Sequence, residues 1–508
     1  FMFTKTITNF KQGMTPNLYG DGIFKIEHFG HVTEQARPYR ALVLSDMTHG
    51  EGGAMLSTTK FATISGIIYT IGEEVGSGSR PILSKWDGTN KYWDNFQSFN
   101  KDSIYAQMIF GYAGNLYGLW RDGSAATTGY LWKMTTAGSL TAQHQTKAWT
   151  NYCDPFYRKA NNLEYLGIDN VIYSFDGTTL TAVFTHPLTT FVWTCIAENG
   201  IYIQLTGYDT ASLEATSYLW DGNSTVNDVN QKYNLGFDYP LHTATLGDFH
   251  FFVLSDRTNA NIADVGTQQS KKLIIKYSLN DGILKDVNTF YFKELYAYGT
   301  SSNGSIEVGG RFVEDDKLYF GASAKFQNET TTSKVIFCLD SKGNLSIAQN
   351  LDVDTSSLSY PIGILKQRDG WWFGMGGITA TNNWNTTTTE ATYSYPAFFE
   401  TPIFSSNNFT NNINILGYTV TTEPLASGAS VIIKVRGDNE TAWTTLSTHD
   451  TDGSVDYAMI GIVSATGLAY GTRSQMQFRL ESIGGAVITG FSVTFNEIPS
   501  NTYSYATK

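Results

Sequence analysis

Two short runs decide the fold: Asn162-Leu163-Glu164-Tyr165-Leu166 and, close behind it, Val171-Ile172-Tyr173-Ser174-Phe175-Asp176-Gly177. Both are rich in aromatic and β-branched residues, and the second alternates in the way that half-buried strands do. The second run ends in Asp-Gly, and glycine accepts the positive φ that a tight hairpin turn requires. The two runs therefore predict neighbouring antiparallel strands.

The same unit recurs along the chain. Its opening strand carries an aromatic residue, and these residues follow one another at intervals of 37 to 67 positions: Tyr69, Tyr117, Tyr165, Tyr202, Phe252, Tyr319 and Trp372. Repeats of about 40–60 residues with several strands each are typical of β-propeller blades. We predict an all-β chain with an about seven-bladed β-propeller over residues 58–400. Stacked meanders or two sandwiches are the alternative.

The pattern changes after the propeller. The run Val487-Ile488-Thr489-Gly490-Phe491-Ser492-Val493-Thr494-Phe495 alternates apolar and polar residues, as a sheet with one solvated face requires. We predict an antiparallel β-sandwich over residues 401–498 and an exposed tail over 499–508. Residues 1–57 fit neither unit and are predicted to form an N-terminal arm. Within it, Tyr39-Arg40-Ala41-Leu42-Val43-Leu44 is a candidate closing strand for the last blade.

Composition narrows the classes of function. Charged residues make up 16% of the 508 positions, against about 25% in ordinary domains. The net charge of −12 argues against extended nucleic-acid binding, which needs a basic face.

Cysteine usage and hydropathy indicate where the protein is made. The three cysteines, Cys153, Cys195 and Cys338, are too few and too scattered for a disulfide framework and are interpreted as buried thiols. We find no signal peptide and no apolar run long enough to span a membrane. We therefore expect synthesis in a reducing cytoplasm and no membrane insertion.

Two stretches resemble bacteriophage tail proteins. The first is Asn9-Phe10-Lys11-Gln12-Gly13-Met14. The second is the hairpin Pro424-Leu425-Ala426-Ser427-Gly428-Ala429-Ser430-Val431, continuing to Trp443, with Arg473 and the strand Gln475-Met476-Gln477-Phe478-Arg479-Leu480 after it. With the repeats, the plan is similar to propeller-bearing virion proteins such as tail nozzle, collar and baseplate subunits. The resemblance implies a structural tail protein that is located in the virion, binds other tail proteins and forms a homo-oligomer around the tail axis.

Catalytic and metal-binding motifs are not found. No Gly-x-Ser-x-Gly elbow or Walker A sequence is present. His28 and His31 lie three positions apart, but no further ligand pattern follows them. We predict no catalytic residue, no cofactor and no metal site.

A propeller glycoside hydrolase is one alternative function. It would need two carboxylates in a central cleft, and the candidates are Asp87, Glu164, Asp176, Asp221 and Glu307. Three of the five precede glycine, so turn formation accounts for them without catalysis. The arginines are scattered, though a propeller axis can bring such positions together: Arg37, Arg80, Arg121, Arg158, Arg257, Arg311 and Arg368.

A receptor- or carbohydrate-binding tail adhesin is the other alternative. The long polar loops 256–269 and 380–390 would then make the contacts with a host surface glycan. Trp384, in the second loop, is the candidate sugar contact, because an exposed indole can stack on a sugar ring.

Overall fold

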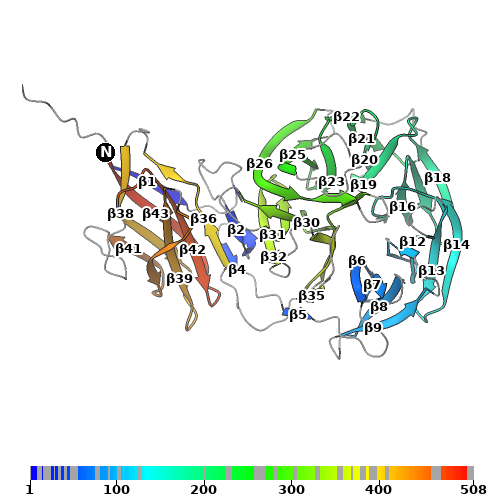
Figure 1. Cartoon of the computed structure of the whole chain (residues 1–508), viewed down its shortest axis with the longest axis horizontal. Helices are drawn as coiled ribbons and strands as arrows, with labels where there is room; N and C mark the ends of the chain where they lie inside the picture. The colour runs from blue at the N-terminus through cyan, green and yellow to red at the C-terminus, as the bar shows by residue number, and fades with distance from the viewer. Residues whose placement is uncertain are drawn as a thin grey trace, which may run out of the picture.

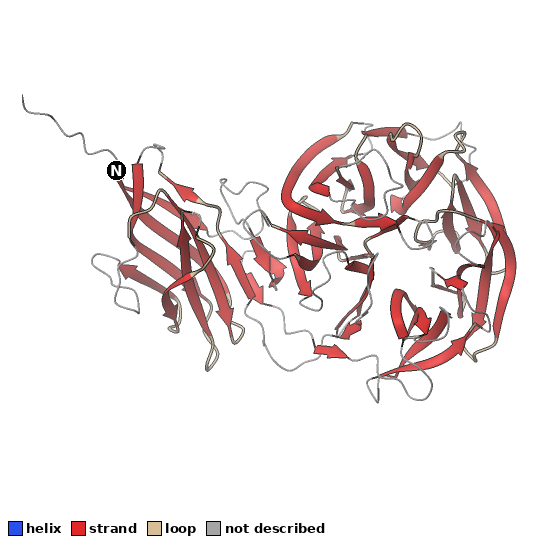
Figure 2. Cartoon of the chain, in the orientation of Figure 1, coloured by secondary structure: helices blue, strands red, loops and turns tan. Residues whose placement is uncertain are grey.

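The computed structural model is all-β, and no helix occurs in the part of the chain that it describes (Figure 2). The described residues are 2–7, 14, 25–27, 29–32, 36–38, 43–45, 55–74, 81–87, 89, 92–99, 104–106, 108–122, 128–199, 202–222, 231–256, 270–279, 283–300, 306–326, 332–351, 359–367, 370–377, 385–387, 397–406, 411–438, 440–458 and 471–499. A ring of sheets forms the propeller, and a sandwich lies beside it (Figure 1). Within the described residues no helix is long and apolar enough to cross a membrane.

Four antiparallel sheets follow one another in the first part of the ring. The first sheet contains β6 (Met55–Ile64), β7 (Ile67–Glu74), β8 (Pro81–Asp87) and β9 (Tyr92–Ser98). The second contains β10 (Ile104–Ala106), β11 (Phe110–Tyr112), β12 (Asn115–Asp122), β13 (Thr128–Thr135) and β14 (Leu140–Ala148). The third contains β15 (Phe156–Arg158), β16 (Leu163–Ile168), β17 (Val171–Phe175) and β18 (Leu180–Thr185), and the fourth contains β19 (Phe191–Asn199), β20 (Tyr202–Asp209), β21 (Ala215–Trp220) and β22 (Gln231–Gly236).

The next two strand groups form one eight-stranded sheet, because β26 pairs with β30. A pair of short strands, β27 and β28, lies between the groups in sequence. The strands are β23 (Tyr239–Leu246), β24 (Phe249–Ser255), β25 (Ser270–Ser278), β26 (Lys285–Tyr296), β27 (Tyr298–Thr300), β28 (Ile306–Val308), β29 (Arg311–Glu314), β30 (Lys317–Lys325), β31 (Ser333–Asp340) and β32 (Leu345–Leu351).

The ring closes with strands from both ends of the propeller sequence. β33 (Ser359–Gln367) pairs with β34 (Gly370–Gly377), and β35 (Asn385–Thr387) pairs with β5 (Val43–Ser45). β34 contacts both β35 and β6. Val43 and Leu44, the described end of the candidate closing strand, therefore lie at the junction between the last and first sheets. The number of blades stays a prediction.

The prediction of which strand opens each unit is wrong, because the structure has one more strand before it. The seven aromatic residues of the predicted opening strands lie in β7, β12, β16, β20, β24, β30 and β34. Each of these strands is preceded by another that pairs with it, such as β15 before β16. Two of these preceding strands, β11 and β15, are only three residues long and leave little local pattern, whereas β6, β19, β23 and β33 have eight to ten residues.

The sandwich consists of two six-stranded sheets. One contains β1 (Met2–Ile7), β3 (Phe29–Val32), β4 (Ala36–Pro38), β38 (Asn411–Thr422), β41 (Ser454–Ala458) and β43 (Ile488–Pro499). The other contains β2 (Lys25–Glu27), β36 (Ala397–Glu400), β37 (Phe404–Ser405), β39 (Ser430–Gly437), β40 (Thr444–His449) and β42 (Gln475–Ile483). In β43, Phe491, Val493 and Phe495 are buried and the residues between them are half-buried, as the alternation predicted.

The limits of the two parts differ from the predicted ones. The expected N-terminal arm supplies β1–β4 to the sandwich, and β36 joins it before residue 401. The tail over 499–508 lies outside the described residues except for Pro499, which ends β43. These additions could not be read from local pattern, because β1 pairs with a strand from the opposite end of the chain.

The two parts pack against each other around the N-terminal segment. β2 belongs to the sandwich and also contacts β32 of the propeller. Met14 is buried, and its backbone N–H donates to the carbonyl of Leu345, 2.6 Å away. One cluster of buried apolar side chains includes residues of both parts, such as Phe337 and Phe399. This continuous core holds the propeller and the sandwich together.

Candidate functional site

The axis of the ring brings together polar side chains that are distant in sequence. Lys60 comes from β6, Asp154 from the segment before β15, and Arg311 from the start of β29. Each belongs to the first strand of its group, or leads into it. Because the first strands contact their counterparts in neighbouring sheets, their side chains meet near the axis.

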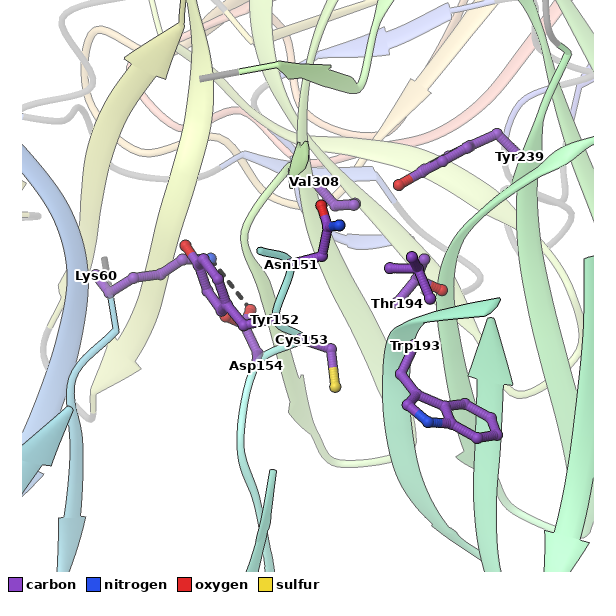
Figure 3. A pocket seen from close by; sticks show the side chains of 10 residues that line it. Lys60, Asn151, Tyr152, Cys153, Asp154, Trp193, Thr194, Tyr239 and Val308 are labelled. Carbon is purple, nitrogen blue, oxygen red and sulfur yellow. Dashed lines mark hydrogen bonds and ion pairs between the residues drawn. The ribbon is translucent and has the colours of Figure 1, made fainter. Parts of the chain in front are cut away.

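Lys60 and Asp154 form an ion pair that spans from the first sheet to the third. The ammonium lies 3.1 Å from both carboxylate oxygens. The side chains are 15% and 32% exposed, so water screens the pair only partly. Figure 3 shows the pair beside Tyr152 and Cys153.

Arg311 links three first strands. One guanidinium nitrogen, Nη1, donates to the Sγ of Cys195 and to the carbonyl of Thr243, the latter at 3.2 Å. Nη2 donates to the carbonyl of Ile196 at 2.5 Å. These acceptors lie in β19 and β23, so the side chain reaches from one strand group to two others. No carboxylate pairs with Arg311 among the described residues.

The groups around Arg311 are held neutral. Burial raises the pKa values of the Cys153 and Cys195 thiols, so both are protonated at neutral pH. Burial lowers the pKa of His242, and the neighbouring Arg311 charge lowers it further. All three cysteines are free, and Cys338 is half-buried.

Two hollows lie along the axis, and Lys60 and Asp154 line both of them. The first, drawn in Figure 3, is narrow and is lined by residues near the beginnings of first strands. The second has a volume of about 330 Å³, and we call it the axial chamber. The axial chamber is lined by Lys60, Phe61, Ala62, Met108, Ile109, Phe110, Gly111, Asp154, Pro155, Tyr157, Glu164, Gly310, Arg311, Gly363 and Ile364.

Glu164 is the one predicted carboxylate that reaches the axial chamber. Glu164 is the second residue of β16, and it is 4% exposed. Burial raises its pKa to about 8, so it carries a proton at neutral pH. Neither an ion pair nor a hydrogen bond of its side chain is present among the described residues. Its neighbour in the chamber, Asp154, forms the ion pair with Lys60.

The side chains of Asp87, Asp176 and Asp221 line neither of the two hollows. Asp87 accepts from the backbone N–H of Thr89 at 2.8 Å, and Asp176 accepts from Thr178 at 2.8 Å. Both therefore hold hairpin turns, and hydrogen bonds from the backbone N–H groups of Thr179 and Thr178 lower the pKa of Asp176. Asp221 lies at the end of the strand before Gly222, which has a φ of +88°. The side chain of Glu307 lies outside the described residues.

The remaining predicted positions are placed as follows. Trp384 lies outside the described residues, as does nearly all of both long loops. Within the described residues no three His, Cys, Asp or Glu side chains gather in a way that could hold a metal ion. At the axis, the guanidinium of Arg311 and the buried carboxyl group of Glu164 both line the axial chamber.

The axial cluster was largely missed at the sequence level. Arg311 was noted only as one of several scattered arginines, and neither Lys60 nor Asp154 was singled out. The two partners of this ion pair lie 94 positions apart, and no short motif joins them. Both lie on or just before first strands, which the sequence pattern did not identify.

No protein-family model and no curated protein matches the sequence. Among solved structures, the chain is similar to the computationally designed Ika8 protein, with a TM-score of 0.41 and 11% identity over 68% of this chain and 100% of that one. It is also similar to a chain of the mitotic checkpoint complex, with a TM-score of 0.41 and 8% identity over 69% of this chain and 94% of that one. A prolyl endopeptidase structure gives a TM-score of 0.39 and 10% identity over 70% of this chain and 55% of that one. At these identities the likenesses say nothing about activity or partners.

Proposed function

We propose that this chain is a non-enzymatic structural subunit of a bacteriophage tail, which acts by protein–protein assembly and occurs in several copies around the tail axis. The resemblance of the hairpin over residues 424–443 to tail proteins supports the proposal. In the structure this hairpin is part of the sandwich, where β39 pairs with both β40 and β42.

The open edge of the sandwich carries the proposal. β40 is the outermost strand of its sheet, and no described strand pairs with its outer side. Its sequence, Thr444-Thr445-Leu446-Ser447-Thr448-His449, contains no Asp, Glu, Lys or Arg. Proteins that stay monomeric usually protect such edges with charged side chains. An edge of this kind suits the addition of a strand from another chain.

The interlocked chain path also suits a load-bearing subunit. The N-terminal residues supply strands to the sandwich and then to the closing sheet of the ring. Separating the two parts would require exposing the core that they share.

The chemistry of the axis supports a non-enzymatic role. Asp154 is neutralised by Lys60, and the guanidinium of Arg311 bonds to two backbone carbonyls and a thiol. Through these contacts the three charged groups bridge neighbouring strand groups. A hydrolase would instead need a second carboxylate free to attack or to activate water.

The test is assembly of the full chain. The purified chain is imaged by negative stain, alone and after mixing with the other tail proteins of the same phage. The proposal predicts rings, or incorporation into tail assemblies. A strict monomer that never joins the other tail proteins would contradict it, and sugar release abolished by Glu164→Gln would instead support a hydrolase.

A further inference from the structure

The axial chamber contains one positive charge without a partner. Among the described residues that line it, Lys60 and Asp154 neutralise each other. Glu164 is buried and carries a proton, so it adds no charge at neutral pH. Arg311 keeps its charge because guanidinium does not deprotonate in proteins. Arg311 is half-buried, and a cation without a carboxylate partner in the wall of a chamber attracts an anion.

Arg311 also keeps donors for such an anion. A guanidinium has five N–H groups, and three of them donate to Cys195, Thr243 and Ile196. The remaining two belong to Nε and Nη2. Donors on these two nitrogens can meet the oxygens of a carboxylate.

The rest of the lining suits a molecule with hydroxyl groups. A protonated Glu164 offers one O–H donor and a carbonyl acceptor. Apolar surface comes from Met108, Phe110 and Ile364. The volume of about 330 Å³ lies at the lower end of the range for ligand pockets, roughly 300–1,000 Å³. This size fits one monosaccharide rather than a chain of them.

We propose that the axial chamber binds a monosaccharide-sized sugar acid, with its carboxylate on Arg311 and its hydroxyl groups on Glu164. The proposal is independent of whether the chain assembles into a tail. A binding site at the axis and an assembly edge on β40 use different parts of the molecule.

The test is calorimetric titration of the full chain with D-galacturonate and, as the uncharged counterpart, D-galactose. At neutral pH we expect galacturonate to bind at least about tenfold more tightly than galactose, because only it forms the charged pair. Arg311→Met is expected to remove this preference. Arg473→Met is the matched control, because Arg473 pairs with Glu440 in the sandwich and does not line the chamber.

A second set of variants keeps the test decisive if Arg311→Met does not fold. Ile364→Trp fills the chamber and should abolish galacturonate binding while the chain stays folded by thermal melting. In the unmodified chain binding should weaken as the pH rises above 8, and Glu164→Gln should remove that loss. The proposal is overturned if galacturonate does not bind, if galactose binds equally well, or if Ile364→Trp leaves binding unchanged.

Discussion

The propeller axis and the outer face of the sandwich both bury charged side chains, but they balance them differently. On the sandwich sheet that contains β36, β39 and β42, Glu400 and Glu481 lie among Lys434, Arg436 and Arg479. At the axis, one cation has no carboxylate partner and one carboxyl group is protonated. In the sandwich cluster, cations and carboxylates pair with one another, whereas at the axis one cation lacks a carboxylate partner.

The sandwich cluster is complete within itself. Glu400 lies 3.7 Å from Arg436 and 3.6 Å from Arg479, and Glu481 lies 2.7 Å from Lys434 and 2.9 Å from Arg479. Arg436 also donates to the side-chain oxygen of Gln477 at 2.7 and 3.0 Å. Each buried carboxylate thus has two cations, and the cluster ties three strands together.

The axial cluster has fewer partners and more space. Its one ion pair, Lys60–Asp154, is partly exposed, and a chamber lies beside it. The guanidinium of Arg311 keeps two N–H groups that its contacts with Cys195, Thr243 and Ile196 do not use. The difference indicates that the sandwich cluster is structural and that the axial cluster is open to a ligand.

The largest expected effect comes from breaking the complete cluster. Glu400→Ala leaves Arg436 without its carboxylate and Arg479 with one fewer, and Glu400 is 2% exposed. Removing one partner of a buried pair costs about 3–5 kcal/mol. Urea denaturation should show this loss in the free energy of unfolding. Glu440→Ala is the control, because its pair with Arg473 is about one-third exposed and should contribute about 1 kcal/mol or less. Equal losses would remove the distinction.

The next largest effect is the pH dependence that the buried Glu164 at the axis gives to the free energy of unfolding. The pKa of Glu164 is about 8 in the folded chain, above its ordinary value of 4.5. Between these values the folded chain holds a proton that the unfolded chain has lost, so the free energy of unfolding falls as the pH rises from about 4.5 to 8. The slope is at most about 1.4 kcal/mol per pH unit.

Glu164→Gln should remove this component of the pH dependence, because the amide does not titrate. The measurement is urea denaturation of both chains at several pH values in that window. His186 contributes with the opposite sign, since burial lowers its pKa from 6.5 to about 4. Its contribution is common to both chains and cancels in their difference. Parallel curves for the two chains would contradict the assignment.

A smaller effect is expected at the axial ion pair. Lys60→Met should cost about 1 kcal/mol, because the pair with Asp154 is only partly shielded from water. Lys85→Met is the matched change in the same sheet, where the pair with Asp94 is 36% and 41% exposed at 3.6 Å. The control should unfold at nearly the same urea concentration as the unmodified chain. A larger loss for Lys85→Met would contradict the ranking.

The sequence predicted the strands and turns that have a clear local pattern of residues. The aromatic strands such as β16 and the Asp-Gly turns were identified because alternation and positive φ leave clear traces. The short first strands, such as β15, leave almost none. The N-terminal strands were missed for a second reason, because β1 pairs with β43 across nearly the whole chain.

The candidate site shows the same division. Glu164 was singled out because it lies in a recognisable strand, but its position at the axis depends on how the ring closes. Lys60, Asp154 and Arg311 gain their roles only from contacts between strand groups. Such contacts join residues about a hundred positions apart, and one sequence does not reveal them.

The central claim is that the chain assembles through its edges, and the mass of the purified chain tests it most directly. Size-exclusion chromatography with light scattering would compare the unmodified chain with Thr445→Lys/Thr448→Lys on β40, and with Thr181→Lys on the outer strand β18 of the propeller. We expect the unmodified chain to form a defined oligomer. The β40 variant should be monomeric, and Thr181→Lys should leave the oligomer intact. A monomer in all three cases, with no association when other tail proteins are added, would contradict it.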